Sequence, residues 1–165
     1  MKRILSIAVM ISAALALQAC NQGPDPAKVQ ADVTKAQADG QKKIADAQAD
    51  LDKVVAKNQK ALADTQADAQ KDVNSATATP ADANKAAADA SNDMAKARAD
   101  AANEVADGQY GVDKAKATAA YNVAAAQCEA QTGDAEKACK DKAKATYDAS
   151  VTAADNKKNA AHQQH

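Results

Sequence analysis

Between residues 29 and 73, hydrophobic side chains recur at intervals of eleven residues. Eleven residues make three helical turns of 3.67 residues each, so these positions form a nearly straight stripe along one helix. The stripe is narrow, and Gly40, Asn58 and Gln66 interrupt it. It predicts a weak side-by-side contact with another helix, not a tight coiled-coil zipper. The two apolar columns are Val29, Gly40, Leu51, Leu62 and Val73, and, four residues further on, Val33, Ile44, Val55 and Gln66.

Capping residues and prolines place the first boundaries. Asp25 is a suitable N-cap, and Pro26 fits the first turn of a helix. We therefore expect a long amphipathic helix over residues 27–78. It should weaken near residue 75 and end before Pro80, because proline lacks the N–H group and disfavours a helical conformation in the residue before it.

A second helix is predicted over residues 79–131. Thr79 suits its N-cap, with a proline next and Asp82 in the first turn. Gly108 and Gly111 lie in its interior. Each costs about 1 kcal/mol of helix stability relative to alanine, so a kink or a break is expected there.

The chain should turn back at Gly133. This glycine suits a left-handed C-cap, and Asp134 suits the N-cap of the next helix. A third helix is therefore expected over residues 132–160, forming a hairpin with the second. Residues 161–165 should fray.

The composition limits the size of the core. Hydrophobic residues make up 46% of the chain, but most of them are alanine, and Phe and Trp are missing altogether. A buried Val or Leu contributes about 1.5–3 kcal/mol, whereas ordering costs about 1–2 kcal/mol per residue for the backbone alone. So few large side chains cannot support a wide core. The expected fold is all-α, with elongated helices, narrow seams between them and little globular core.

The N-terminal residues are typical of an exported protein. Two basic residues precede a short apolar run, Ile4–Leu17, which suits a secretory signal better than a membrane span. Leu17-Gln18-Ala19-Cys20 resembles the lipobox of bacterial lipoproteins. The resemblance implies a signal peptide over residues 1–19, an acyl chain on Cys20, and an anchor and linker over residues 20–26. Asn21 stands where an Asp retains enterobacterial lipoproteins in the inner membrane, which implies delivery to the outer membrane.

The charges indicate a solvated surface. Two of the 21 Lys and Arg residues precede Cys20, which leaves 19 against 22 acidic residues and no basic cluster. Nucleic acid is therefore not an expected partner. Asp repeatedly stands three residues before Lys, where a pair contributes about 0.2–0.5 kcal/mol to a helix. The expected pairs are Asp32–Lys35, Asp39–Lys42, Asp50–Lys53, Asp68–Lys71, Asp82–Lys85, Asp93–Lys96, Asp113–Lys116, Asp134–Lys137, Asp141–Lys144 and Asp155–Lys158.

Cys128 and Cys139 are predicted to form a disulfide. With Cys20 acylated they are the two remaining cysteines, and an exported protein meets oxidising conditions. They stand five and six residues on either side of Gly133, so a turn there brings them level on adjacent helices. Closing so short a loop would stabilise the fold by about 3 kcal/mol in the loop-entropy model.

Other candidate chemistry is sparse. Tyr110, Tyr121 and Cys128 share one helix face. Tyr147 and Val151 could cover that face, which we interpret as hairpin packing, with a tyrosine-lined ligand groove as the alternative. No metal or other cofactor is expected, because no further Cys or His lies near the cysteine pair. No catalytic arrangement of Ser, His and Asp and no phosphate-binding glycine loop is present, so we expect no enzyme activity.

The segment around the cysteine pair resembles a known family. Its residues are Tyr121-Asn122-Val123-Ala124-Ala125-Ala126-Gln127-Cys128, Thr132-Gly133-Asp134-Ala135 and Ala138-Cys139-Lys140. They are similar to a module of Ala/Lys-rich, TolA-like cell-envelope proteins of beta- and gamma-proteobacteria. The resemblance implies an exported helical protein without a settled activity. The single anchor and long helix are also similar to the murein lipoproteins, and the eleven-residue repeat to late-embryogenesis-abundant stress proteins.

These features predict an outer-membrane lipoprotein with a rod-like helical part in the periplasm and a structural or interaction role. A helix of about fifty residues reaches about 75 Å, so the C-terminal hairpin should lie far from the membrane. The expected partners are the membrane through the lipid and a second copy, another envelope protein or peptidoglycan. Two alternatives stay open. One is a hydrated stress-protection protein that is partly unfolded until it dries, and the other is a lipid-surface binder that uses the 29–73 stripe.

Overall fold

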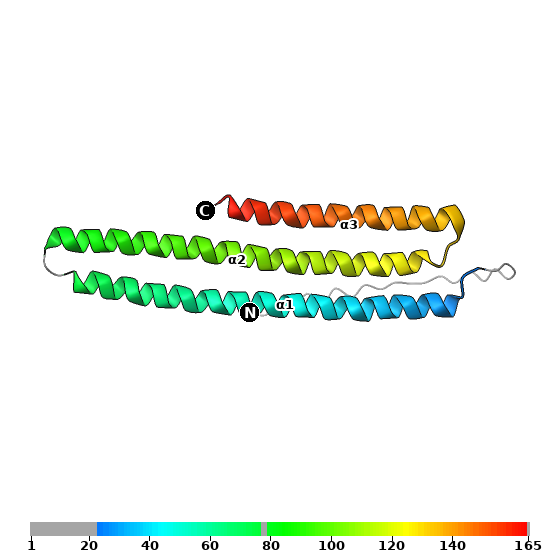
Figure 1. Cartoon of the computed structure of the whole chain (residues 1–165), viewed down its shortest axis with the longest axis horizontal. Helices are drawn as coiled ribbons and strands as arrows, with labels where there is room; N and C mark the ends of the chain where they lie inside the picture. The colour runs from blue at the N-terminus through cyan, green and yellow to red at the C-terminus, as the bar shows by residue number, and fades with distance from the viewer. Residues whose placement is uncertain (1–22, 77–78, 165) are drawn as a thin grey trace, which may run out of the picture.

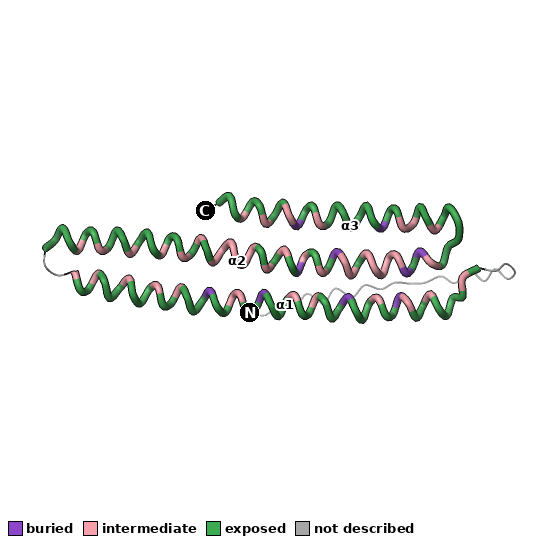
Figure 2. The backbone as a smooth tube through the Cα atoms, viewed as in Figure 1, coloured by how far each residue is buried: buried purple, intermediate pink, exposed green. Residues whose placement is uncertain are grey.

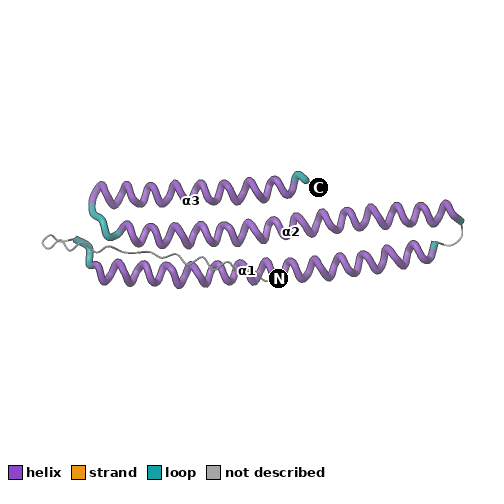
Figure 3. Tube along the Cα trace, turned by 180° about the vertical axis from the view of Figure 1, so that it is seen from behind, coloured by secondary structure: helices purple, strands orange, loops and turns teal. Residues whose placement is uncertain are grey.

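The computed structural model describes residues 23–76 and 79–164 of the 165-residue chain. Three helices follow one another: α1 (Pro26–Ser75), α2 (Pro80–Cys128) and α3 (Gly133–His162) (Figure 1). Figure 3 shows that the described part of the chain contains no strand. The prediction of an all-α, elongated fold is therefore confirmed.

The first two helices begin with the predicted caps. The Asp25 carboxylate accepts a hydrogen bond of 2.9 Å from the backbone N–H of Ala27. The Thr79 hydroxyl accepts one of 3.2 Å from the backbone N–H of Asp82 and donates one of 2.8 Å to the Asp82 carboxylate. Both caps satisfy N–H groups that have no partner inside the helix. Helix α1 ends at Ser75, three residues before the predicted boundary at 78.

The turn between α2 and α3 differs in detail from the prediction. Gly133 has a left-handed φ of +62°, as expected, but it is the first residue of α3. Thr132 occupies the N-cap position, and Asp134 lies in the first turn, where its charge is favourable beside the positive helix end. Helix α3 also continues to His162, beyond the predicted end at 160. His162 Nε2 lies 3.1 Å from an Asp107 carboxylate oxygen, which gives this last turn a partner on α2.

The helices form an open layer instead of a closed bundle. Among the described residues, α2 packs against both α1 and α3, whereas α1 and α3 do not contact each other (Figures 1 and 3). The buried residues follow narrow lines along the seams (Figure 2). Among the residues that the structure describes, Val112 and Cys128 are the side chains less than 2% exposed, so the prediction of a small core is confirmed. They lie on α2, the one helix with a neighbour on each side.

Three level pairs fix the antiparallel register of α1 and α2. Gly40 faces Ala119, Leu51 faces Gly108, and the Asn58 side-chain amide donates a hydrogen bond of 3.2 Å to the Ala101 carbonyl oxygen. In each pair the two residue numbers add up to 159, the sign of an unbroken antiparallel register. Gly40 and Asn58 therefore do not interrupt the seam, contrary to the prediction. Both are buried in it: Gly40 permits the close approach of Ala119, and Asn58 holds α2 through its hydrogen bond.

The predicted break at Gly108 and Gly111 is wrong as well. Helix α2 runs unbroken from Pro80 to Cys128. A Cβ at Gly108 would lie 2.8 Å from Leu51 Cδ1, so this glycine is a notch for a leucine, whereas nothing lies within 4 Å of a Cβ at Gly111. Packing against a neighbouring helix offsets the low helix propensity of glycine.

Most of the predicted Asp–Lys pairs do not form. Of the ten, Asp50–Lys53 and Asp155–Lys158 are within ion-pair distance. Many lysines instead pair with an acid four residues further on, which is also a neighbour on a helix. Lys85 and Lys96 each have an acid three residues before and another four residues after, and each pairs with the later one. The observed Lys–Asp pairs at this spacing are Lys28–Asp32, Lys60–Asp64, Lys85–Asp89, Lys96–Asp100 and Lys144–Asp148.

These ion pairs predict a loss of stability on the alkaline side. Hydrogen bonds to Asp64, Asp89 and Asp100, with the attraction of the same carboxylates, raise the pKa values of Lys60, Lys85 and Lys96 above 10.5. A raised pKa means that the folded state holds the proton more tightly. The stabilisation is therefore complete below pH 10.5 and is lost as the pH rises through the folded-state pKa.

The expected result is constant helix content between about pH 7 and pH 10 and a decrease above about pH 10.5. Circular dichroism during an alkaline titration measures it. At about 1 M salt the decrease should be smaller, because these pairs are exposed and screened. A decrease that begins below about pH 9 would contradict the assignment to lysine.

Candidate functional site

The best-defined constellation of side chains lies at the turn between α2 and α3. Cys128 and Cys139 form the predicted disulfide, with their Cα atoms 5.6 Å apart. Two helical turns further from the loop, Tyr121 and Tyr147 pack together with ring centroids 5.6 Å apart. The disulfide and the aromatic pair therefore fasten α3 to α2 at successive levels.

An apolar groove of about 360 Å³ runs between α2 and α3 beside these two pairs. Four alanines, the two tyrosines and the two cysteines form its apolar wall, and five polar side chains, Lys142 among them, complete the lining. Because Tyr121 and Tyr147 contact each other across the groove, the interpretation as hairpin packing accounts for their positions. The alanines that line it are Ala117, Ala120, Ala124 and Ala143.

Tyr110 does not belong to this groove. Two lysines approach its ring, with Lys158 Nζ 4.9 Å and Lys114 Nζ 5.9 Å from the ring centroid. A cation over an aromatic ring is favourable. Tyr110 therefore helps to hold the C-terminal part of α3, and the expected single face of Tyr110, Tyr121 and Cys128 is divided into two contacts.

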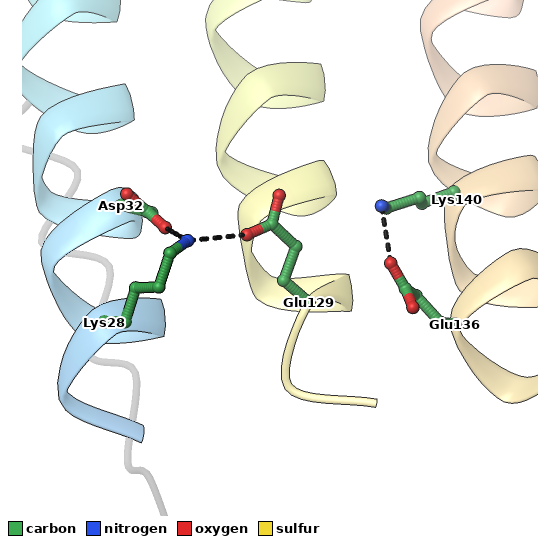
Figure 4. A network of polar contacts seen from close by, with 5 residues as sticks. All are labelled: Lys28, Asp32, Glu129, Glu136 and Lys140. Atoms are coloured by element: carbon green, nitrogen blue, oxygen red, sulfur yellow. Dashed lines mark hydrogen bonds and ion pairs between the residues drawn. The ribbon is translucent and has the colours of Figure 1, made fainter. Parts of the chain in front are cut away.

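The start of α1 lies beside the end of α2. Lys28 Nζ is 2.6 Å from an Asp32 oxygen and 3.9 Å from a Glu129 oxygen, which links the two helices (Figure 4). On the other side, Lys140 Nζ lies 2.6 Å from a Glu136 oxygen within α3. The first turn of α1 and the disulfide hairpin thus share one end of the molecule.

This arrangement corrects the expectation that the C-terminal hairpin lies far from the start of the long helix. Helix α2 has 49 residues and α1 has 50, so α2 returns along the whole length of α1. The far end is instead the connection between Ser75 and Pro80. The sequence did not decide this, because it did not show whether the helices trail in a line or fold back on one another.

Some predicted features lie outside the described residues or have no counterpart there. Cys20, the proposed acylation site, and the signal peptide fall within residues 1–22, which the structure does not describe. None of the three described helices is long and apolar enough to span a membrane. Within residues 23–76 and 79–164, no group of three or more His, Cys, Asp or Glu side chains is placed to hold a metal ion.

Comparisons with known proteins add no relative. The chain matches no protein-family model, no curated protein sequence and no solved structure. The resemblance to Ala/Lys-rich envelope proteins therefore stays a prediction.

Proposed function

We propose that this protein is an outer-membrane lipoprotein whose helices form a stiff periplasmic spacer with a structural or interaction role in the cell envelope. One observation carries the proposal. Helix α1 begins at Pro26, six residues after Cys20, and continues without a break for 50 residues. At 1.5 Å per residue it extends about 75 Å from the anchor.

The packing of α2 along α1 supports a stiff spacer. The contacts of Gly40 with Ala119, Leu51 with Gly108 and Asn58 with Ala101 are spread over the inner and middle parts of α1. A single exposed helix of this composition would have no large apolar face to hold it in place. Two helices in fixed register bend less easily than one, which suits a part that holds its two ends at a set distance.

Three contacts between the helices gather at the proposed anchor end, which fits the role of a stiff spacer. The Cys128–Cys139 disulfide, the Tyr121–Tyr147 contact and the link from Lys28 to Glu129 all lie near the first turns of α1. The lipid would hold the chain at this end, where the disulfide and the aromatic pair keep α3 on α2 and the Lys28 link keeps α2 beside α1.

Replacing Cys20 by serine tests the anchor. We expect the Cys20→Ser variant to lose its acyl chains and to leave the membrane fraction, with at least about a tenfold decrease in membrane-bound protein. The reason is that the serine variant has nothing to replace an anchor of several acyl chains. Cell fractionation and mass spectrometry of the mature chain measure both effects. The matched control is the Cys128→Ser, Cys139→Ser double variant, which should remain acylated and membrane-bound. An unchanged distribution of Cys20→Ser would sink the proposal.

The stress-protection alternative differs in a property that is easily measured. A chain that is partly unfolded in water should gain helix content on drying and show no cooperative melting. The spacer should be strongly helical in dilute buffer and lose that helicity in a cooperative transition. Circular dichroism on heating separates the two.

A further inference from the structure

The outer half of the α1–α2 hairpin carries an apolar groove that α3 does not reach. Helix α3 ends at His162, which lies opposite Asp107. Beyond that point α1 is the one described element beside α2. Two adjoining hollows of about 320 Å³ and 340 Å³ lie between the helices there. We call them together the outer groove, and its level pairs are Val55 and Val105, Leu62 and Arg98, Gln66 and Met94, and Val73 and Ala87.

The two hollows open on the same face. On each helix the lining positions follow intervals of seven, four and seven residues, so that Val55 and Val73 are five full turns apart, as are Ala87 and Val105. The residue numbers in each level pair add up to 160, one more than in the buried seam, so the groove follows the same antiparallel register as the seam. The outer groove is therefore one continuous strip, about 27 Å long at 1.5 Å per residue.

The charges on the two faces of this outer half differ. Arg98 is the one charged residue that lines the outer groove. On the opposite face, the hollow between the same helices is lined by four carboxylates and one lysine: Asp68, Asp72, Asp93, Asp100 and Lys96. Two copies that met through the acidic face would repel each other, whereas the outer groove presents little like charge to its equivalent.

We propose that the outer groove packs against the outer groove of a second copy about a two-fold axis, which forms a four-helix bundle. A two-helix hairpin has no enclosed core, and pairing two hairpins through their apolar faces is the common way to build one. Small residues such as Ala69, Ala90 and Ala102 line the groove and permit close approach of the helices. Met94 and Leu62 supply the larger apolar groups.

The available area fits a specific contact. A strip about 27 Å long and two helix diameters wide, about 20 Å, has a footprint of about 540 Å² on each copy. Two such footprints make about 1,100 Å², which is close to the minimum of about 1,000 Å² for a biological interface. This pairing does not depend on the lipid anchor, so it can fail while the proposed function stands, and the reverse.

Co-purification of two tagged copies tests the pairing. Two full-length chains with different affinity tags are expressed together, extracted in detergent and purified through one tag. We expect the second copy to co-purify, and Met94→Glu in both copies to reduce its yield about tenfold or more, because closing the contact would then remove a carboxylate from water in each copy. The matched control is Thr65→Glu, which adds the same charge at the same height on the acidic face and should leave the yield unchanged. Circular dichroism checks that both variants stay helical.

A photoreactive amino acid at position 105 identifies what covers the groove in intact cells. A covalent product with twice the mass of the chain supports the proposal. Products with another protein or with lipid alone would overturn it, as would equal co-purification of Met94→Glu and Thr65→Glu. Two chains could also co-purify because their N-terminal lipids share one detergent micelle. Both variants keep the same N-terminal segment, so such sharing would affect them equally and cannot explain a loss of yield confined to Met94→Glu.

Discussion

Replacing both Cys128 and Cys139 with alanine should lower the free energy of unfolding by about 3 kcal/mol, the largest effect that we expect from any single contact in this protein. The disulfide closes a loop with a sequence separation of 11 residues. In the loop-entropy model, opening it restores freedom to the unfolded chain. Cys128 is also one of the two most buried side chains, and its replacement leaves a small void in a core that has few large groups.

The loss should be concentrated in α3. This helix packs on α2 alone, whereas α1 and α2 keep their own seam. Hydrogen exchange should therefore accelerate most over Gly133–His162 and least near the Leu51–Gly108 contact. Unfolding in urea, followed by circular dichroism, gives the overall change. The wild-type chain under reducing conditions is the control and should behave like the double variant. Equal stability of the oxidised and reduced chains would show that the bridge contributes nothing.

Gly40→Ala should destabilise the protein by up to about 2 kcal/mol, although alanine is the better helix former. A Cβ at Gly40 would lie 2.7 Å from Ala119 Cβ and 3.3 Å from Ala119 Cα. Neither atom can move aside, because one belongs to the backbone and the other is fixed to it. The two helices must separate, at a cost of about 1–3 kcal/mol for overpacking, of which the gain of about 1 kcal/mol in helix propensity offsets a part.

Gly111→Ala is the matched comparison. Here nothing lies within 4 Å of the new Cβ, so the substitution should stabilise the chain by about 0.5–1 kcal/mol. Thermal unfolding of the two variants beside the wild type measures the opposite signs. If both substitutions stabilise the chain to the same extent, α1 and α2 do not pack in the register described above.

Local signals in the sequence predicted the elements well. Asp25 and Thr79 cap their helices, and Gly133 adopts the left-handed conformation expected at the turn. The cysteine spacing around that turn predicted the disulfide. In each case the deciding interaction joins residues close together in the chain, and the residue types at those positions largely fix its energy.

Long-range contacts decided what the pattern could not. Gly40, Asn58 and Gly108 looked like flaws in otherwise regular helices, yet each is a contact point against a residue more than forty positions away. The composition of one helix does not state which side chain will lie opposite a glycine. The sequence did not predict the outer groove for the same reason, because its walls come from both α1 and α2.

The sequence by itself determined that this chain is helical, where its helices begin, that its core is thin and that its last two cysteines can join. Only the tertiary structure decided that α2 folds back along α1, that the hairpin lies beside the start of α1 and that the outer half exposes one apolar face. Capping, propensity and short loops act over a few residues, whereas the register between long helices depends on which small and large side chains meet across the seam.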